Sequence, residues 1–450
     1  MPIDHADSVK DLRPKGFLWG ASTSSYQIEG GATADGKGLS IWDGWCRQRG
    51  RVAHDDIGDV ACDHYYRYVE DIALMRGIGI KAYRFSVSWP RVLPRGRGAP
   101  NEKGLDFYDR LIDGLLEAEI EPWLCLYHWD LPQALQDLGG WTNRDIAAWF
   151  GDYAALVAQR YGDRVKRFAT FNEPGVFTLF GYALGWHPPG LPDRSACIRA
   201  VHHVNLAHGT AVDVLRGLVT DAKIGCVHNV QPVRPASPEK ADAAGASMLD
   251  ALWNRAFPDP QIRGHYPPEL ADLVEPHMQA GDLARICRKA DWFGLNHYSP
   301  IYARGDAEGA FGFAWADPPA EAERTRIGWE IDPQAFGQVL RDLHSRYRLP
   351  IYVTENGAGA DEELDSEGKL DDQHRIRFIG AYIGAMREAI ADGADVRGYF
   401  VWSLLDNFEW GSGYAFRFGL IHVDYKTLRR TRKASADWFA GLIQLEDDHG

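Results

Sequence analysis

Cysteine is scarce in this sequence of 450 residues, with six in widely separated positions at Cys46, Cys62, Cys125, Cys197, Cys226 and Cys287. No pair has C-x-x-C spacing, so neither a structural zinc site nor a disulfide framework is indicated. We therefore expect reduced, buried thiols and a cytoplasmic location.

Long apolar runs and basic runs are also missing. No apolar stretch reaches about 18 residues, and residues 1–14 alternate charges, so neither a membrane span nor a signal peptide is expected. The 63 acidic residues outnumber the 49 basic ones, for a net charge of −14, which makes nucleic acid and anionic membranes poor partners. No flexible linker or solenoid repeat divides the chain, which favours one domain over residues 1–450, although the length also permits several.

Aromatic residues, by contrast, are plentiful: the chain has 16 Trp, 19 Tyr and 19 Phe, together 12%. Large aromatic side chains fill hydrophobic cores. A flat ring also packs on the apolar C–H face of a pyranose, while the indole N–H and the phenol O–H stay free for its hydroxyls. Core packing and a sugar-binding surface are therefore both open interpretations at this point.

Short β-branched or aromatic runs alternate with longer amphipathic stretches. The expected strands are 16–21, 81–86, 121–127, 167–172, 223–230, 292–296, 351–355 and 398–403. The expected helices are 65–77, 104–118, 146–161, 198–218, 333–347, 373–392 and 432–443. This alternation implies a parallel sheet, and at this length a single closed (β/α)8 TIM barrel is the economical fold. Segments rich in Pro, Gly and charge are expected to be extended loops, at 91–103, 187–194, 231–239, 257–269 and 304–329.

In such a barrel the functional groups lie at the C-terminal ends of the strands. Polar residues at these ends are Gln27, Glu29, Arg84, Ser86, His128, Asp130, Asn172, Glu173, Asn296, His297, Tyr298, Glu355, Asn356, Asp406, Asn407 and Glu409. Two of them, Glu173 and Glu355, end apolar strands and precede turn-forming residues. Both are therefore expected to point into the mouth of the barrel.

Two carboxylates that face one cavity are what glycoside hydrolysis requires, because one protonates the leaving oxygen while the other attacks the anomeric carbon or activates water. Their pKa values must differ. Arg84 and the Tyr298 hydroxyl are candidates to keep one carboxylate ionised, and apolar surroundings would keep the other protonated. For either glutamate taken alone, an ion pair on the barrel rim is the alternative.

Nine motifs follow one another along the chain: FLWGASTSSYQIEG at 17–30, RFSVSWPRV at 84–92, LYHWDLPQAL at 126–135, TFNEP at 170–174, GLNHYSP at 294–300, GWEIDP at 328–333, VTENG at 353–357, SLLDNFEW at 403–410 and RFGLIHVDY at 417–425. This ordered set, from about residue 15 to the C-terminal helix, resembles the signature segments of glycoside hydrolase family 1, the β-glucosidase family. A single E-N-G or N-E-P would carry little information, whereas the whole set is very specific.

The resemblance implies a retaining mechanism in which Glu173 is the acid/base and Glu355 the nucleophile. The two carboxyl groups are then expected to lie about 5–5.5 Å apart, the spacing of retaining enzymes. The resemblance further implies that Asn172 binds the sugar 2-hydroxyl and that Arg84 and Tyr298 support the nucleophile, with Tyr298 also counted among the substrate contacts.

For the sugar in the inner subsite, the resemblance gives Gln27, His128 and Glu409 as hydroxyl ligands. It also gives Trp402 as the stacking floor and Trp410 as an indole N–H donor. Burial in an aromatic box would make each missed hydrogen bond costly.

Other candidates have a competing packing role. Asn296 lies beside the nucleophile supports and is expected to contact substrate, with strand-end packing as the alternative. Trp329 resembles the family's Trp on the leaving-group side of the entrance, with a loop-capping role as the alternative. The offsets among His202, His203 and His208 do not place the three on one helix face, so we expect packing there, with no metal site and no cofactor.

Some positions distinguish this chain from specialised members of the family, and one differs from the usual family sequence. The pair Glu409 and Trp410 is intact, whereas members that act on 6-phosphorylated sugars replace it with Ser and bring in Lys and Tyr. Glu173 is present, whereas plant thioglucosidases lack the acid/base carboxylate. The family usually has Trp directly after N-E-P, where this chain has Gly175, so the leaving-group side is expected to differ in shape.

The sequence thus predicts an exo-acting retaining β-glycosidase, foremost a β-glucosidase that removes terminal glucose from small β-glucosides or cello-oligosaccharides in cellulose degradation. The same site would also suit a β-galactosidase, a β-fucosidase or a transglycosylase. A catalytically silent sugar-binding barrel is the alternative from another class. The expected partners are small sugars, and both a monomer and a homo-oligomer fit the sequence.

Overall fold

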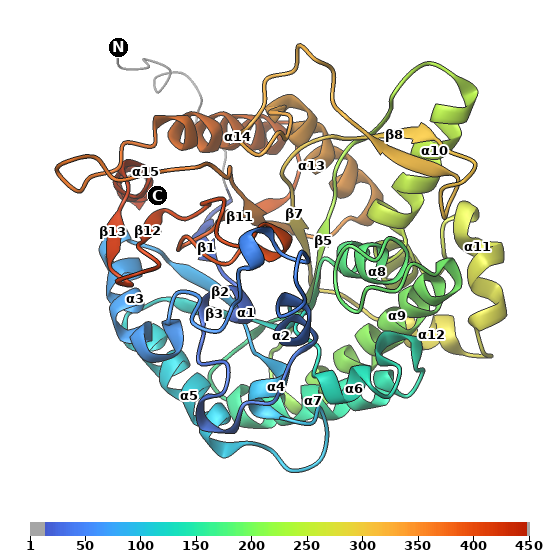
Figure 1. Ribbon diagram of the computed structural model, residues 1–450, viewed down its shortest axis with the longest axis horizontal. Coiled ribbons are helices and arrows are strands. Elements are labelled where there is room, and N and C mark those ends of the chain that lie inside the picture. The colour runs from blue at the N-terminus through green and yellow to red at the C-terminus, as the bar shows by residue number, and fades with distance from the viewer. Residues whose placement is uncertain (1–13, 448–450) are drawn as a thin grey trace.

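Eight parallel strands form a closed barrel in the computed structural model, which describes residues 14–447 (Figure 1). Each strand pairs with its neighbours in chain order, and the last pairs with the first. The strands are β1 (Leu18–Ser22), β2 (Ala82–Ser86), β3 (Glu121–Tyr127), β4 (Arg167–Asn172), β5 (Lys223–Asn229), β7 (Trp292–Asn296), β10 (Ile351–Asn356) and β11 (Val396–Trp402). All eight were predicted at these places, which confirms the (β/α)8 barrel.

The strands could be predicted because a parallel barrel buries both faces of each strand, so their sequences are continuously apolar or aromatic. All five residues of β2, for example, are buried. Where the run contains a polar residue, such as Arg84 in the same strand, that residue belongs to the site described below.

An outer ring of helices covers the barrel (Figure 1). Its main members are α3 (His64–Ile78), α5 (Glu102–Glu117), α7 (Ile146–Tyr161), α9 (Arg194–Leu218), α13 (Pro333–Tyr347), α14 (Gln373–Ala391) and α15 (Ala434–Asp447). Two of them begin at an aspartate cap: the Asp193 carboxylate accepts from the Ser195 amide at 2.8 Å, and that of Asp332 accepts from the Ala335 amide at 3.0 Å. Such caps satisfy backbone donors that the helix leaves unpaired.

Aromatic rings fill the interior of the barrel. Trp123 lies 5.1 Å from Trp292, 4.7 Å from Tyr352 and 5.2 Å from Phe400, measured between ring centroids. All four are buried and form one apolar cluster inside the strands. The barrel is therefore a packed core rather than a channel, as is usual for this fold.

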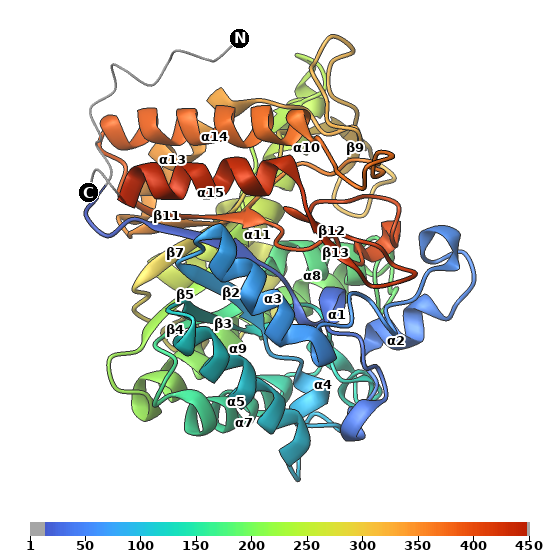
Figure 2. The ribbon, with the colours of Figure 1, turned by 90° about the vertical axis from the view of Figure 1, so that its left-hand side faces the viewer.

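The loops after the strands carry further elements. These are α1 (Ser25–Ile28), α2 (Ile41–Cys46), α4 (Trp89–Val92), α6 (Gln133–Gln136), α8 (Pro174–Tyr182), α10 (Lys240–Asp250), α11 (Pro268–Val274), α12 (Asp282–Ile286), β6 (Val233–Pro235), β8 (Ile301–Gly305), β9 (Phe313–Ala316), β12 (Ile421–Val423) and β13 (Arg430–Arg432). In Figure 2, α1, α2, β12 and β13 lie together at one end of the barrel.

The prediction of plain loops at 231–239, 257–269 and 304–329 was wrong in part. Strands β6, β8 and β9 form a separate three-stranded sheet. A π-helix, η5 (Asp259–Arg263), occupies part of the second segment, and another, η4 (Ala251–Arg255), precedes it. These elements depend on tertiary contacts, because three strands of only three to five residues give no periodic signal of their own.

A buried network of charges anchors the chain just after β11. The Asp406 carboxylate accepts from Lys433 Nζ at 2.7 Å and from Arg417 Nη1 at 2.8 Å, and Lys433 also pairs with Glu362 at 2.5 Å. Asp406 and Lys433 are fully buried. Because breaking such a network leaves an unpaired buried charge, it fixes the loop that continues to Glu409.

Several expectations concern the chain ends and membranes. Residues 1–13, for which no signal peptide was expected, lie outside the described part of the chain, as do residues 448–450. Among the helices of the described part, none has the length and apolar character needed to cross a membrane.

Candidate active site

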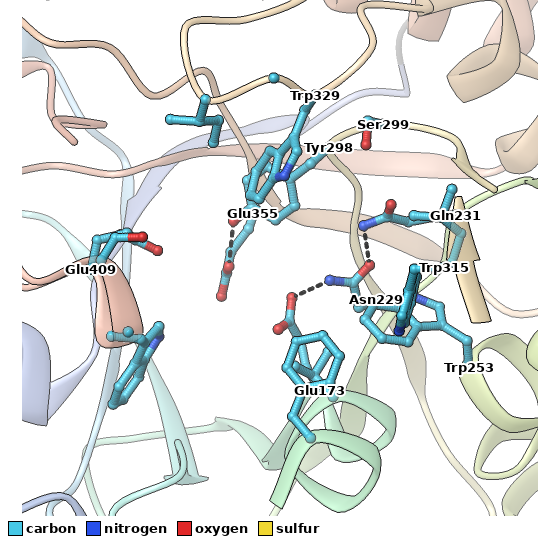
Figure 3. A pocket seen from close by; sticks show the side chains of 18 of the residues that line it. Glu173, Asn229, Gln231, Trp253, Tyr298, Ser299, Trp315, Trp329, Glu355 and Glu409 are labelled. Carbon is cyan, nitrogen blue, oxygen red and sulfur yellow. Dashed lines mark hydrogen bonds between the residues drawn. The ribbon is translucent and has the colours of Figure 1, made fainter. Parts of the chain in front are cut away.

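A cavity of about 570 Å³ opens at the carboxyl ends of the strands. Of the residues predicted from the sequence, Glu173, Glu355, His128, Tyr298, Trp329, Trp402, Glu409 and Trp410 line it. Glu173 and Glu355 approach it from different strand ends, with their carboxyl groups turned toward one another (Figure 3). The remaining predicted residues lie behind this lining and hydrogen-bond to it, as described next.

Glu355, near the end of β10, is held from both sides of its carboxylate. Oε1 accepts from Arg84 Nη1 at 2.6 Å, and Oε2 accepts from the Tyr298 hydroxyl at 2.7 Å. Burial raises the pKa of Glu355, while the Arg84 guanidinium and the Tyr298 hydroxyl oppose that rise. The arginine and the tyrosine therefore favour the ionised form of Glu355.

Glu173 follows β4 in the left-handed backbone region, with φ 46°, directly before Pro174 at the start of α8. An ordinary residue is strained in this conformation, and such strain is commonly found at functional sites. Here it places the Glu173 side chain over the barrel mouth. One of its oxygens, Oε1, accepts from Asn229 Nδ2 at 2.9 Å and from Asn296 Nδ2 at 2.8 Å.

These two amide donors decide which oxygen of Glu173 can carry a proton. Oε1 already accepts two N–H groups, so a proton on the carboxyl group has to sit on Oε2, which makes no hydrogen bond to the described residues. Burial, followed by the charge of Glu355, raises the pKa of Glu173 to about 8. At neutral pH Glu173 is thus mostly protonated, opposite a carboxyl group whose ionised form Arg84 and Tyr298 stabilise, the division of roles that acid-assisted displacement at a sugar carbon needs.

Asn172 joins the two carboxylates to His128. Its Oδ1 accepts from Arg84 Nη2 at 2.6 Å and from Asn296 Nδ2 at 3.0 Å, so its amide nitrogen is the donor toward His128 Nε2 at 3.0 Å. Burial and then the Arg84 charge lower the pKa of His128 well below its usual value, so the ring is neutral and accepts this bond. One rigid polar layer thus extends from Glu355 to His128.

Gln27 and Glu409 form a second polar group on the far side of the cavity. Gln27 Nε2 donates to Asn407 Oδ1 at 2.9 Å and to Glu409 Oε2 at 3.4 Å, and its Oε1 accepts from the Ser24 hydroxyl at 2.6 Å. Burial and the Glu355 charge raise the pKa of Glu409 to about 8. The carboxyl group of Glu409 faces the cavity, where it can bind hydroxyl groups (Figure 3).

The aromatic residues are divided between the core and the lining of the cavity. Trp42, Trp89, Trp123, Trp141 and Trp292 are buried in the core. Seven other tryptophans line the cavity: Trp129, Trp186, Trp253, Trp315, Trp329, Trp402 and Trp410. Such a lining suits the apolar faces of sugar rings.

The aromatic walls fall into an inner and an outer group. On the inner wall, the ring of Trp410 stacks at 4.7 Å on Trp129, and His128 stacks at 5.9 Å on Trp402. On the outer rim, Trp329 is 38% exposed and packs at 5.2 Å against Tyr298.

The three histidines of α9 pack in the core instead of forming a cluster. His202 Nε2 lies 2.8 Å from the Asp282 carboxylate, His203 Nδ1 lies 3.0 Å from the Trp141 carbonyl, and His208 Nδ1 lies 2.8 Å from the Thr170 hydroxyl. Within residues 14–447, no group of three or more metal-ligating side chains is found.

Sequence reasoning missed Asn229, Gln231 and Asn254. Asn229 ends β5 and donates directly to Glu173. Its place at the end of a barrel strand is the sequence signal that points to it. Gln231 lies in an irregular segment and Asn254 in a π-helix, where the sequence carries no comparable signal.

The glycine after the N-E-P motif has a structural consequence. A Cβ atom added at Gly175 would lie 3.0 Å from the carbonyl oxygen of Trp253 in η4. A large side chain would therefore push η4 away from α8. With glycine, η4 packs closely and presents Trp253 to the outer wall of the cavity.

Comparison with known proteins gives a consistent result. The sequence model of glycosyl hydrolase family 1 matches residues 9–448. Beta-glucosidase A of Thermotoga maritima is 45% identical over 444 residues, covering 96% of this chain and 99% of that protein. A 1,4-beta-D-glucan glucohydrolase of Thermotoga neapolitana is 44% identical over 436 residues, covering 96% and 98%. The solved structure of a beta-glucosidase from Thermotoga maritima in complex with glucoimidazole superposes with a TM-score of 0.91 at 44% identity, covering 96% of this chain and 98% of that one.

Proposed function

This chain belongs to glycosyl hydrolase family 1, and on that premise we propose that it is a retaining exo-β-glucosidase. It removes terminal β-D-glucosyl residues from β-glucosides and cello-oligosaccharides. The observation that carries the proposal is the pair Glu173 and Glu355, which face one cavity, with Glu355 held by Arg84 and Tyr298. The names of the relatives, a beta-glucosidase and a glucan glucohydrolase, agree with it.

The first half of the reaction forms a glycosyl-enzyme. A carboxylate oxygen of Glu355 attacks the anomeric carbon, and the bond from that carbon to the leaving oxygen breaks. The proton on Glu173 Oε2 passes to the leaving oxygen, so the alcohol departs neutral and Glu173 becomes a carboxylate. Arg84 and Tyr298 hold Glu355 in place for attack.

The second half returns the protein to its starting state. Glu173, now ionised, takes a proton from water as the water oxygen attacks the anomeric carbon. The bond to Glu355 breaks, and two inversions leave the product in the β configuration. Asn229 and Asn296 stabilise the ionised Glu173 of this step, because each donates an N–H to its Oε1.

The terminal glucose is proposed to bind on the inner wall. Trp402 provides the stacking surface, while Glu409, Gln27 and His128 bind hydroxyl groups and Asn172 binds the 2-hydroxyl. Trp410 adds its indole N–H, Asn296 and Tyr298 complete the polar surround, and Trp329 contacts the leaving group at the entrance.

The wider setting is also part of the proposal. Six free thiols, five of them buried, fit a reducing cytoplasmic location. A β-glucosidase that acts on cello-oligosaccharides acts in the late steps of cellulose degradation, and we include this role in the proposal. We further propose that residues 1–450 form one domain.

Hydrolysis is expected to depend on pH through the two carboxyl groups. kcat/KM falls as pH rises through about 8, because Glu173 then loses the proton that it must donate. It also falls at low pH, where Glu355 gains a proton and can no longer attack. A pH profile of an aryl β-glucoside with a poor leaving group measures both limbs. A rate that continues to rise well above the pKa of Glu173 would contradict its role as the acid.

The direct test of the proposed function uses a set of aryl β-glucoside, β-galactoside, β-fucoside, α-glucoside and 6-phospho-β-glucoside. We expect rapid release from the β-glucoside, with β-glucose as the first product in proton NMR. A higher kcat/KM for the galactoside or fucoside would assign the site to those sugars instead. A lack of turnover throughout, with sugar binding retained in calorimetry, would favour a silent sugar-binding barrel.

A further inference from the structure

A chain of four buried groups connects the outer wall of the cavity to Glu173. Asn229 donates from Nδ2 to Glu173 Oε1 at 2.9 Å, and Gln231 donates from Nε2 to Asn229 Oδ1 at 2.7 Å (Figure 3). Asn254, on the π-helix η4, in turn holds the backbone of Gln231. All four groups are buried.

The orientation of Asn229 depends on Gln231. A carboxamide can turn over and exchange its donor and acceptor ends at little cost unless its partners forbid it. The Gln231 Nε2 donor requires the oxygen of Asn229 on its side, which turns the amide of Asn229 toward Glu173. Without that donor, Asn229 is free to present its oxygen to Glu173, where it would repel the ionised carboxylate.

The backbone of Gln231 is itself fixed by one side chain. The Asn254 carboxamide accepts from the Gln231 amide at 3.0 Å and donates to the Gln231 carbonyl at 2.8 Å, so it occupies both backbone groups of that residue. Asn254 also donates to the Asp250 carboxylate at 2.8 Å, which sets its own orientation. The π-helix thereby determines where the Gln231 side chain begins.

The same π-helix carries Trp253, which lines the outer wall with Trp315 at a centroid distance of 5.4 Å. A π-helical turn is rare and is often found at functional sites. The close packing of η4 on α8, allowed by Gly175, joins this wall to the helix that begins directly after Glu173. The segment that supplies Trp253 to the outer wall thus also holds the chain that orients the acid.

From this geometry we infer that Gln231, held by Asn254, is a positioning residue that sets the proton-donating orientation of Glu173 through Asn229. The inference rests on the proposed function, because it assigns Glu173 the role of acid/base. Gln231 itself needs no contact with substrate. Its effect is confined to the steps in which Glu173 gives or takes a proton.

The readout has to separate this role from a loss of structure. The leaving group of a dinitrophenyl β-glucoside departs with little protonation, whereas an alkyl or unsubstituted phenyl leaving group needs the acid. Loss of positioning should therefore reduce formation of the glycosyl-enzyme in proportion to the basicity of the leaving group. General damage to the site would lower kcat/KM for all substrates by the same factor.

The test compares Gln231→Met with the parent chain and with Gln261→Met as a matched control. Gln261 is also a buried glutamine, on the π-helix η5, and it donates to Asn205 Oδ1 at 3.0 Å, away from Glu173. We expect Gln231→Met to lower kcat/KM about tenfold on the phenyl glucoside, roughly the effect of one hydrogen bond, and much less on the dinitrophenyl glucoside. The alkaline limb should move to higher pH, because the ionised Glu173 loses a donor.

The charged and titratable groups that face Glu173 are Glu355 on β10, Arg84 on β2 and Tyr298 after β7. None of these groups is altered in the variants. A shift in the alkaline limb of the pH profile therefore comes from the changed contact between Asn229 and Glu173. Equal losses of kcat/KM on the phenyl and dinitrophenyl glucosides, or an alkaline limb that does not move, would overturn the inference. If Gln231→Met does not fold, Gln231→Leu gives the same readout, because it also lacks the donor and adds no charge. Failure of the proposed function is distinct, since the parent chain would then hydrolyse neither glucoside.

Discussion

Replacing Glu355 by glutamine is expected to abolish turnover, lowering kcat at least about 10⁴-fold, as removal of a catalytic nucleophile does elsewhere. Glutamine keeps the size of the side chain, but its neutral amide cannot attack the anomeric carbon. It also leaves the buried Arg84 without its carboxylate partner, so the free energy of unfolding should fall as well. Steady-state kinetics on an aryl β-glucoside and urea denaturation measure the two effects.

A matched control comes from the loop after the same strand. Glu363 is exposed on that loop, and Glu363→Gln removes one charge outside the cavity, so its activity and stability should stay close to those of the parent. Near-normal hydrolysis by Glu355→Gln would exclude Glu355 as the nucleophile and with it the retaining mechanism. Loss of stability without loss of turnover would reduce Glu355 to a structural partner of Arg84.

Replacing Glu173 by glycine should produce the second largest effect, a loss of about 10²–10⁴-fold on substrates with poor leaving groups, the range for a general acid/base. Glycine suits this position because the backbone has φ 46°, a conformation that glycine adopts without strain. Turnover of a dinitrophenyl glucoside should then be limited by the second step, with Glu355 carrying the glucosyl group. Intact-protein mass measurement would detect that intermediate.

Added azide should restore turnover of this variant, because the small anion fits where the carboxyl group was and needs no base. The expected product is the β-glucosyl azide, and an α-azide would instead indicate inversion. Asp221 provides the control: it is exposed and has φ 60°, so Asp221→Gly makes the same exchange in a similar backbone conformation outside the cavity. That variant should be fully active and insensitive to azide.

The sequence predicted the barrel and both carboxylates because each depends on local, periodic information. A strand such as β4 is a continuous apolar run, and a glutamate at its end has only one place to point. The sequence could not give the φ 46° turn at Glu173 or the two amides on a single oxygen, since these depend on three strands meeting at one point. It therefore predicted which carboxylates face the cavity, but not which oxygen of Glu173 is free to carry a proton.

The outer wall was the least predictable part. Trp253 and Trp315 come from a π-helix and a short strand, whose formation depends on packing rather than on sequence period. The departure at Gly175 was visible in the sequence, but its effect was not: the absence of a side chain matters only because the Trp253 carbonyl lies 3.0 Å from where a Cβ would be. The effect of glycine at position 175 can therefore be interpreted only when its neighbours in space are known.

The apolar cluster of Trp123, Trp292, Tyr352 and Phe400 fills the barrel interior, so the cavity is closed at its inner end. A polysaccharide cannot thread through a barrel that is closed below, so a chain end has to enter from the mouth and the freed monosaccharide has to leave by the same route. The shortened chain must dissociate before its new end can enter the cavity. Cleavage is then distributive: all chains in a mixture shorten together, and accumulated glucose competes with chain ends for the single opening.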